Sequence, residues 1–158
     1  MSQIDPNHFT AALKALLHET FYKVDGHFLD RGDSLFETLA QVSAAEASLP
    51  VGGRCATLAA QVKHTAYYLE VVVDSIQTVD FPGADWGLIW QTVSAVDEAE
   101  WAAIQAEMHK QYERIIALID GAPAWPTEAH LAGAIAVVAH SAYHLGEIRQ
   151  ALCTLKNG

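Results

Sequence analysis

Two histidines near the end of the chain have a spacing that suits a metal site. His140 and His144 lie four positions apart in AHSAYHLGEI, a stretch otherwise rich in small and apolar residues. Four residues make about one turn of an α-helix, so both imidazoles would share one face and could reach one ion. Ser141, not Glu, follows the first histidine. The general base of the zinc-protease helix is therefore missing, which argues against a peptidase of that class.

A third ligand is expected from another helix, and His64 in QVKHTAYYLEVV is the best candidate. On a helix, His64 lies about 80° or more from the polar side that carries Glu70. In the C-terminal segment, Arg149 falls about 180° from His140, so the paired imidazoles face the apolar side. Three neutral nitrogen ligands, with positions left for water or substrate, are typical of catalytic zinc sites.

A metal-free interpretation of these histidines stays open, because an inward histidine is often a hydrogen-bonded core residue. Three buried rings without partners would cost roughly 1–3 kcal/mol each, however, and one ion would satisfy all three. Glu147, one turn beyond His144, is expected at the rim of the site, as a general base or as a group that orients a ligand. A solvated carboxylate at the edge of the helix is the alternative.

The sequence predicts that helices hold these residues. Leu, Ala, Glu and Gln recur with helical spacing and strand signals are weak, so the predicted class is all-α, a four-helix bundle with metal ligands on facing helices. The expected long helices cover Asp5 to about Gly26, 54–77, 97–120 and 127–155. A short helix with a capping box at Ser34 and Glu37 is expected over 34–49, and 79–87 is expected to be a loop.

Composition narrows the classes of function. The 158 residues suit one domain, 1–158, and no window is apolar enough for a membrane span. A net charge of −10 with nine Lys and Arg argues against binding to nucleic acid or to an anionic membrane. The beginning of the chain does not resemble a secretion signal, so a cytoplasmic location is expected. Cys55 and Cys153 are expected to be reduced, buried thiols.

The arrangement of motifs resembles the DinB-like proteins over nearly the whole chain. It combines an N-terminal helix, an inward histidine in the second long helix, a tryptophan-bearing connection and a final HSAYHLGEI. That family usually ends in His-x-x-x-His followed by Arg-Gly-Gln-Ile. This chain keeps both histidines, Gly146 and Ile148, and has Leu145 for the Arg and Glu147 for the Gln.

The resemblance implies a bundle with up-down-down-up topology, a long crossover and a short extra helix, usually as a homodimer. It implies a divalent ion, nickel or zinc before iron or manganese, held by three histidines, which by position are His64, His140 and His144. Relatives include thiol-dependent transferases and isomerases, so the expected activity is hydrolysis or thiol transfer on a small-molecule or thiol substrate. The alternative is a non-catalytic dimeric metal-binding or stress-response protein, or a helical interaction module with histidines in its core.

Overall fold

The computed structural model describes residues 5–50, 56–121 and 125–157, and this part of the chain is all-α. It forms seven helices and no strand, apart from an isolated bridge between Pro50 and Thr57. The helices are α1 (Pro6–Phe21), α2 (Leu35–Leu39), α3 (Ala44–Ala47), α4 (Leu58–Gln77), α5 (Leu88–Thr92), α6 (Glu98–Gly121) and α7 (Glu128–Asn157). None of them is long and apolar enough to cross a membrane.

Local capping explains where the long helices begin. The Asp5 carboxylate accepts a hydrogen bond from the Asn7 N–H at 2.8 Å, and proline follows at the first helical position. At the start of α6, the Glu100 N–H donates to the Asp97 carboxylate and the Asp97 N–H donates to the Glu100 carboxylate. Both predicted starts are confirmed. Helix α1 ends at Phe21, earlier than the predicted Gly26, and α4 begins at Leu58 after the cap Thr57, later than predicted.

The predicted continuous helix over 34–49 is wrong, because the segment forms two short helices. Ser43 starts the second of them: its hydroxyl accepts from the Glu46 N–H, and the Glu46 carboxylate accepts from the Ser43 N–H. The predicted capping box at Ser34 is also wrong. The Ser34 hydroxyl lies 2.7 Å from the Glu37 carboxylate and 2.9 Å from the Tyr22 carbonyl oxygen, and its side chain caps no backbone N–H.

The expectation of a buried thiol is wrong for Cys153, the one cysteine that the structure describes. Cys153 is exposed. It lies about 220° around the helix from His140, near the polar side of α7, which explains the exposure. Cys55 lies outside the described residues.

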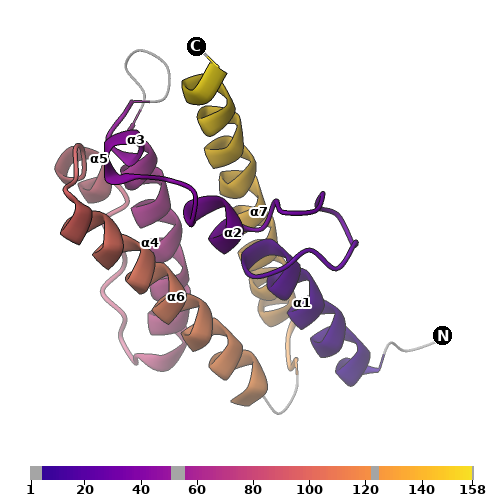
Figure 1. Ribbon diagram of the computed structural model, residues 1–158. Coiled ribbons are helices and arrows are strands. Elements are labelled where there is room, and N and C mark those ends of the chain that lie inside the picture. The colour runs from indigo at the N-terminus through magenta and orange to yellow at the C-terminus, as the bar shows by residue number, and fades with distance from the viewer. Residues whose placement is uncertain (1–4, 51–55, 122–124, 158) are drawn as a thin grey trace.

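Four helices pack together as a bundle. Helix α4 packs against α6 and α7, and α1 packs against α7. Figure 1 shows α4 and α6 running in one direction and α1 and α7 in the other. The connection that contains α5 returns along the length of α4 before α6 begins, so α4 and α6 can lie side by side in parallel (Figure 1).

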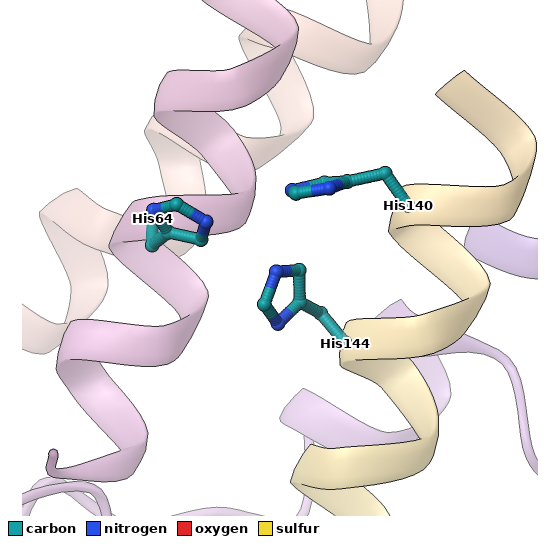
Figure 2. A group of neighbouring side chains, drawn as sticks. All are labelled: His64, His140 and His144. Atoms are coloured by element: carbon teal, nitrogen blue, oxygen red, sulfur yellow. The ribbon is translucent and has the colours of Figure 1, made fainter. Parts of the chain in front are cut away.

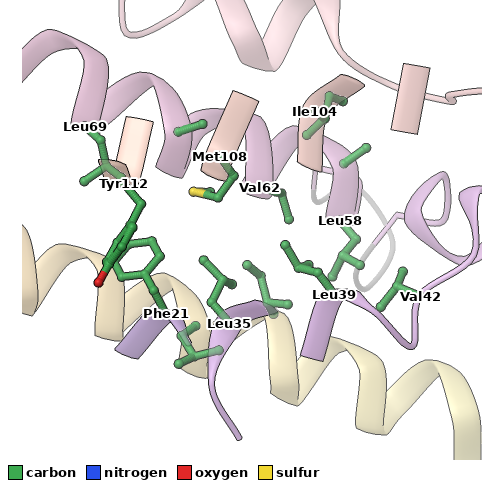
Figure 3. Packing of buried hydrophobic residues seen from close by; sticks show 14 of the residues in the cluster. Phe21, Leu35, Leu39, Val42, Leu58, Val62, Leu69, Ile104, Met108 and Tyr112 are labelled. Atoms are coloured by element: carbon green, nitrogen blue, oxygen red, sulfur yellow. The ribbon is translucent and has the colours of Figure 1, made fainter. Parts of the chain in front are cut away.

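The apolar core is formed by the four long helices α1, α4, α6 and α7 together with the short helices α2 and α3. Leu35 and Leu39 of α2 are buried against Leu58 and Met108, as Figure 3 shows. The indole N–H of Trp101 donates to a backbone carbonyl oxygen, that of Val42, at 2.8 Å. This packing determines which side of α4 faces α6, and therefore which side faces α7.

A buried carboxylate holds the segment after α1. The side chain of Glu19 is fully buried and accepts four backbone N–H bonds of 2.6–3.0 Å, from Asp25, His27, Phe28 and Leu29. Burial by itself raises the pKa of Glu19, but these four hydrogen bonds outweigh it and lower the pKa to about 2. The carboxylate therefore stays ionised and acts as a fixed acceptor for the loop.

Candidate metal centre

The structure brings the three histidines together between α4 and α7. His64 comes from α4, and His140 and His144 come from successive turns of α7, with all three rings pointing toward a common point (Figure 2). One nitrogen of each ring lies within 4.8 Å of one nitrogen of the others. The ring centroids are 4.5 Å apart for the α7 pair and 4.9 and 5.5 Å from His64 to His144 and His140. We call these residues the histidine cluster.

The histidine cluster contains buried nitrogen atoms without a protein partner. His64 is 9% exposed and His144 is 6% exposed. Within the described part of the chain, Nδ1 of His64 and Nε2 of His140 are buried and have no hydrogen-bond partner. Each unsatisfied polar atom of this kind costs about 1–3 kcal/mol. An ion coordinated by these nitrogens would offset that cost, so the residues fit a divalent metal.

Glu147 fixes the orientation of one imidazole. Its Oε2 lies 2.8 Å from Nδ1 of His144. Because an ionised carboxylate can only accept, Nδ1 carries the hydrogen, and in the neutral ring Nε2 keeps its lone pair for an ion. A carboxylate behind a histidine ligand is a recurrent arrangement in metal sites. Two roles were expected for Glu147, a general base or a group that orients a ligand, and this geometry supports the second.

The electrostatics of the site keep imidazoles neutral. Burial, with further contributions from the neighbouring His144 and His64, lowers the pKa of His140 to about 4, against an opposing effect of Glu147. Burial also lowers the pKa of His64, with a second contribution from His144. Only a neutral imidazole can bind a metal. These two rings are therefore in the ligand form at neutral pH.

Aromatic side chains surround the histidine cluster. The ring of Tyr68 stacks on His140 with centroids 3.7 Å apart and an interplanar angle of 19°. The ring centroid of Trp90 in α5 lies 4.6 Å from that of His64, and the ring centroid of Trp86 lies 6.1 Å from it. Tyr143 is exposed, and its ring centroid lies 5.0 Å from that of His144. Trp86 and Trp90 therefore lie against His64 on the side of the α4–α6 connection.

Sequence reasoning did not assign Trp90 to the site. The available signal was weak: Trp86 and Trp90 are four residues apart in the connection before α6, and tryptophans in such positions usually serve packing. The contact with His64 depends on the path of the whole connection. It could not be derived from local pattern.

The fold and the site together define an all-helical protein with a buried three-histidine cluster that could hold a metal ion. A comparison of the chain with models of protein families, with curated proteins and with solved structures found no match.

Proposed function

We propose that the chain is a divalent-metal-dependent enzyme of the DinB-like type, in which His64, His140 and His144 hold the ion. The observation that carries the proposal is the convergence of three imidazoles from two helices, with His64 and His144 buried and His140 partly buried. Two of the rings have a nitrogen that lacks a hydrogen-bond partner. The helix directions in Figure 1 support an up-down-down-up bundle with a long crossover. The residues matched to the family ending lie on α7 at the cluster.

Nickel or zinc is the proposed ion, with iron and manganese as further candidates. Neutral imidazole ligands suit zinc, nickel, copper and iron better than magnesium or calcium, which prefer oxygen. When bound, such an ion polarises a carbonyl group or activates water or a thiol, which provides for hydrolysis or thiol transfer on a small-molecule or thiol substrate.

The protein's own residues have distinct positioning roles in this proposal. Glu147 holds the His144 ring through Nδ1, and Tyr68 holds the His140 ring by stacking. Trp90 covers His64 and excludes water from one side. Tyr143 lies at the exposed rim; a hydrogen bond with the Glu147 carboxylate raises the pKa of its phenol, so the phenol stays protonated and able to donate at neutral pH.

Elemental analysis tests the metal site directly. Untagged protein purified without added metal should contain nearly one equivalent of nickel, zinc, iron or manganese. The His64→Ala variant should lose that ion, whereas His8→Ala, which removes an exposed imidazole from α1, should keep it. If wild-type protein binds no ion even after each is added to the metal-free form, the proposal is wrong.

A non-catalytic metal-binding protein is the second candidate, and one observation favours it. The histidine cluster lines neither the pocket beside Arg149 and Cys153 nor the apolar pocket beside Ile119 and Val137. Cobalt-loaded protein distinguishes the candidates, because its visible absorption changes when a small thiol enters an open coordination position. A spectrum that small thiols do not change would favour the structural role.

A homodimer is also part of the proposal. Sedimentation equilibrium should give twice the mass of the 17.1 kDa chain. A single-chain mass across the micromolar range would rule the dimer out.

A further inference from the structure

A large apolar cavity lies at the end of the bundle where α4 and α6 finish and α7 begins. It has a volume of about 790 Å³, and its walls include Ile76 of α4, Ile115 and Ile119 of α6, and Gly133 and Val137 of α7. Cavities of roughly 300–1,000 Å³ are the usual size for small-molecule sites. The histidine cluster does not line it.

Small side chains keep this cavity open. A Cβ atom added at Gly133 would meet no heavy atom within 4 Å, so the space in front of this glycine is empty. Alanines occupy several other wall positions, namely Ala117, Ala129 and Ala134. Gly133, Ala117 and Ala129 are exposed, so the cavity is a groove open to solvent, with buried Ile115 and Ile119 among its walls. A concave, mostly apolar groove of this size is the usual form of a small-molecule site.

The chemistry of the lining selects an uncharged ligand. Among the described residues that line the cavity, none is Asp, Glu, Lys or Arg, and side-chain polar atoms come only from Ser75, Gln77, Trp125 and His130. The Trp125 N–H donates to the Thr10 hydroxyl. The Ser75 hydroxyl donates to the Val72 carbonyl oxygen, and Nδ1 of His130 lies 2.6 Å from the Thr127 hydroxyl. The Gln77 amide and the second nitrogen of His130 are therefore the groups that can bind a polar end of a ligand.

We propose that this cavity binds an uncharged, apolar small molecule that carries one hydrogen-bonding group. The concave shape, with buried isoleucines among its walls, suits a molecule that enters it rather than a flat protein surface. The net charge of −10 disfavours an anionic amphiphile such as a fatty-acid carboxylate.

The ligand site is separate from the histidine cluster. Val72 lies one turn from Tyr68 along α4, and Val137 lies one turn from His140 along α7. The stacked rings of Tyr68 and His140, 3.7 Å apart, therefore stand between the cavity and the rest of the cluster. Binding should be the same with and without metal, so the proposal does not depend on the metal-dependent function.

The test is a titration of metal-free protein, in EDTA, with the neutral fluorescent dye Nile red. Wild-type protein should bind one dye per chain saturably, and 1-octanol should displace it. Gly133→Leu should weaken binding at least tenfold, because the leucine occupies the cavity. Gly146→Leu is the matched control and should stay within twofold: it lies on the same helix, and its Cβ also meets no atom within 4 Å.

Amide chemical shifts locate the bound molecule without any variant. Octanol should shift the signals of 72–77 and 129–137 and leave those around His144 unchanged. Unsaturable dye binding, shifts elsewhere, or equal affinity of Gly133→Leu and wild type would overturn the proposal. So would a wild-type dimer that Gly133→Leu dissociates, because a second copy would then cover the cavity. If the proposed metal site proves wrong, saturable dye binding by the metal-free His64→Leu variant would still support the proposed cavity.

Discussion

Replacing His64 by leucine in the metal-free protein should stabilise it. The substitution removes a side chain that is 9% exposed and whose Nδ1 has no hydrogen-bond partner in the described structure. Removing such an atom is worth about 1–3 kcal/mol. The lost ring contact with Trp90, at 4.6 Å, costs about 0.5–1.5 kcal/mol. The central values leave a gain of about 1 kcal/mol, or about 2–4 °C in Tm for a chain of this size.

Metal should reverse the order of stability. At one hundred times its Kd, an ion that binds only the folded state stabilises the wild type by about 2.7 kcal/mol. His64→Leu keeps only two of the three imidazoles and should lose most of this gain. With zinc, the wild type should therefore be more stable than the variant by about 1–2 kcal/mol.

Thermal unfolding followed by circular dichroism at pH 7.5, with EDTA or with zinc, measures both differences. His8→Leu, which replaces an exposed histidine on α1, is the control and should change either value by less than about 0.5 kcal/mol. The reasoning fails if His64→Leu is less stable than wild type in EDTA, or if zinc stabilises both proteins equally.

Three further predictions follow from single contacts. Glu147→Ala should weaken metal binding about 10–100-fold in a chelator competition, because His144 loses its 2.8 Å partner; an unchanged affinity would contradict the role of Glu147. Glu19→Gln should lower the urea midpoint at pH 7, because an amide cannot accept all four backbone N–H bonds. Since the pKa of Glu19 is lowered from 4.5 to about 2, its contribution is complete above about pH 4.5 and is lost as the pH falls toward 2, so wild type and variant should converge there; a constant difference would refute this. Trp101→Phe leaves the Val42 carbonyl oxygen unpaired and should cost about 1–3 kcal/mol in urea unfolding, whereas a loss below 0.5 kcal/mol would show that the bond contributes little.

Much of the site's local geometry could be predicted because it lies within one helix. The i, i+4 spacing of His140 and His144 requires only that 128–157 be helical, and the same helix brings Glu147 back to His144 at i, i+3. By contrast, the split between α2 and α3 was missed because two competing caps, Ser34 and Ser43, have the same spacing to a glutamate. Only the bond to the Glu46 N–H decides between them, and sequence spacing does not show it.

The all-α class, the long helices and the pairing of histidines on α7 could be predicted from the sequence, because caps, breakers and side-chain periodicity act between residues close in the chain. Tertiary packing brings His64, the third ligand expected from the sequence, to that pair. Packing alone places Trp90 against His64 and leaves an apolar cavity open beside α7. These features depend on the rotation and offset of α4 against α7. That arrangement results from the packing of the whole core, including Leu35 and Leu39 of α2, and no local pattern encodes it.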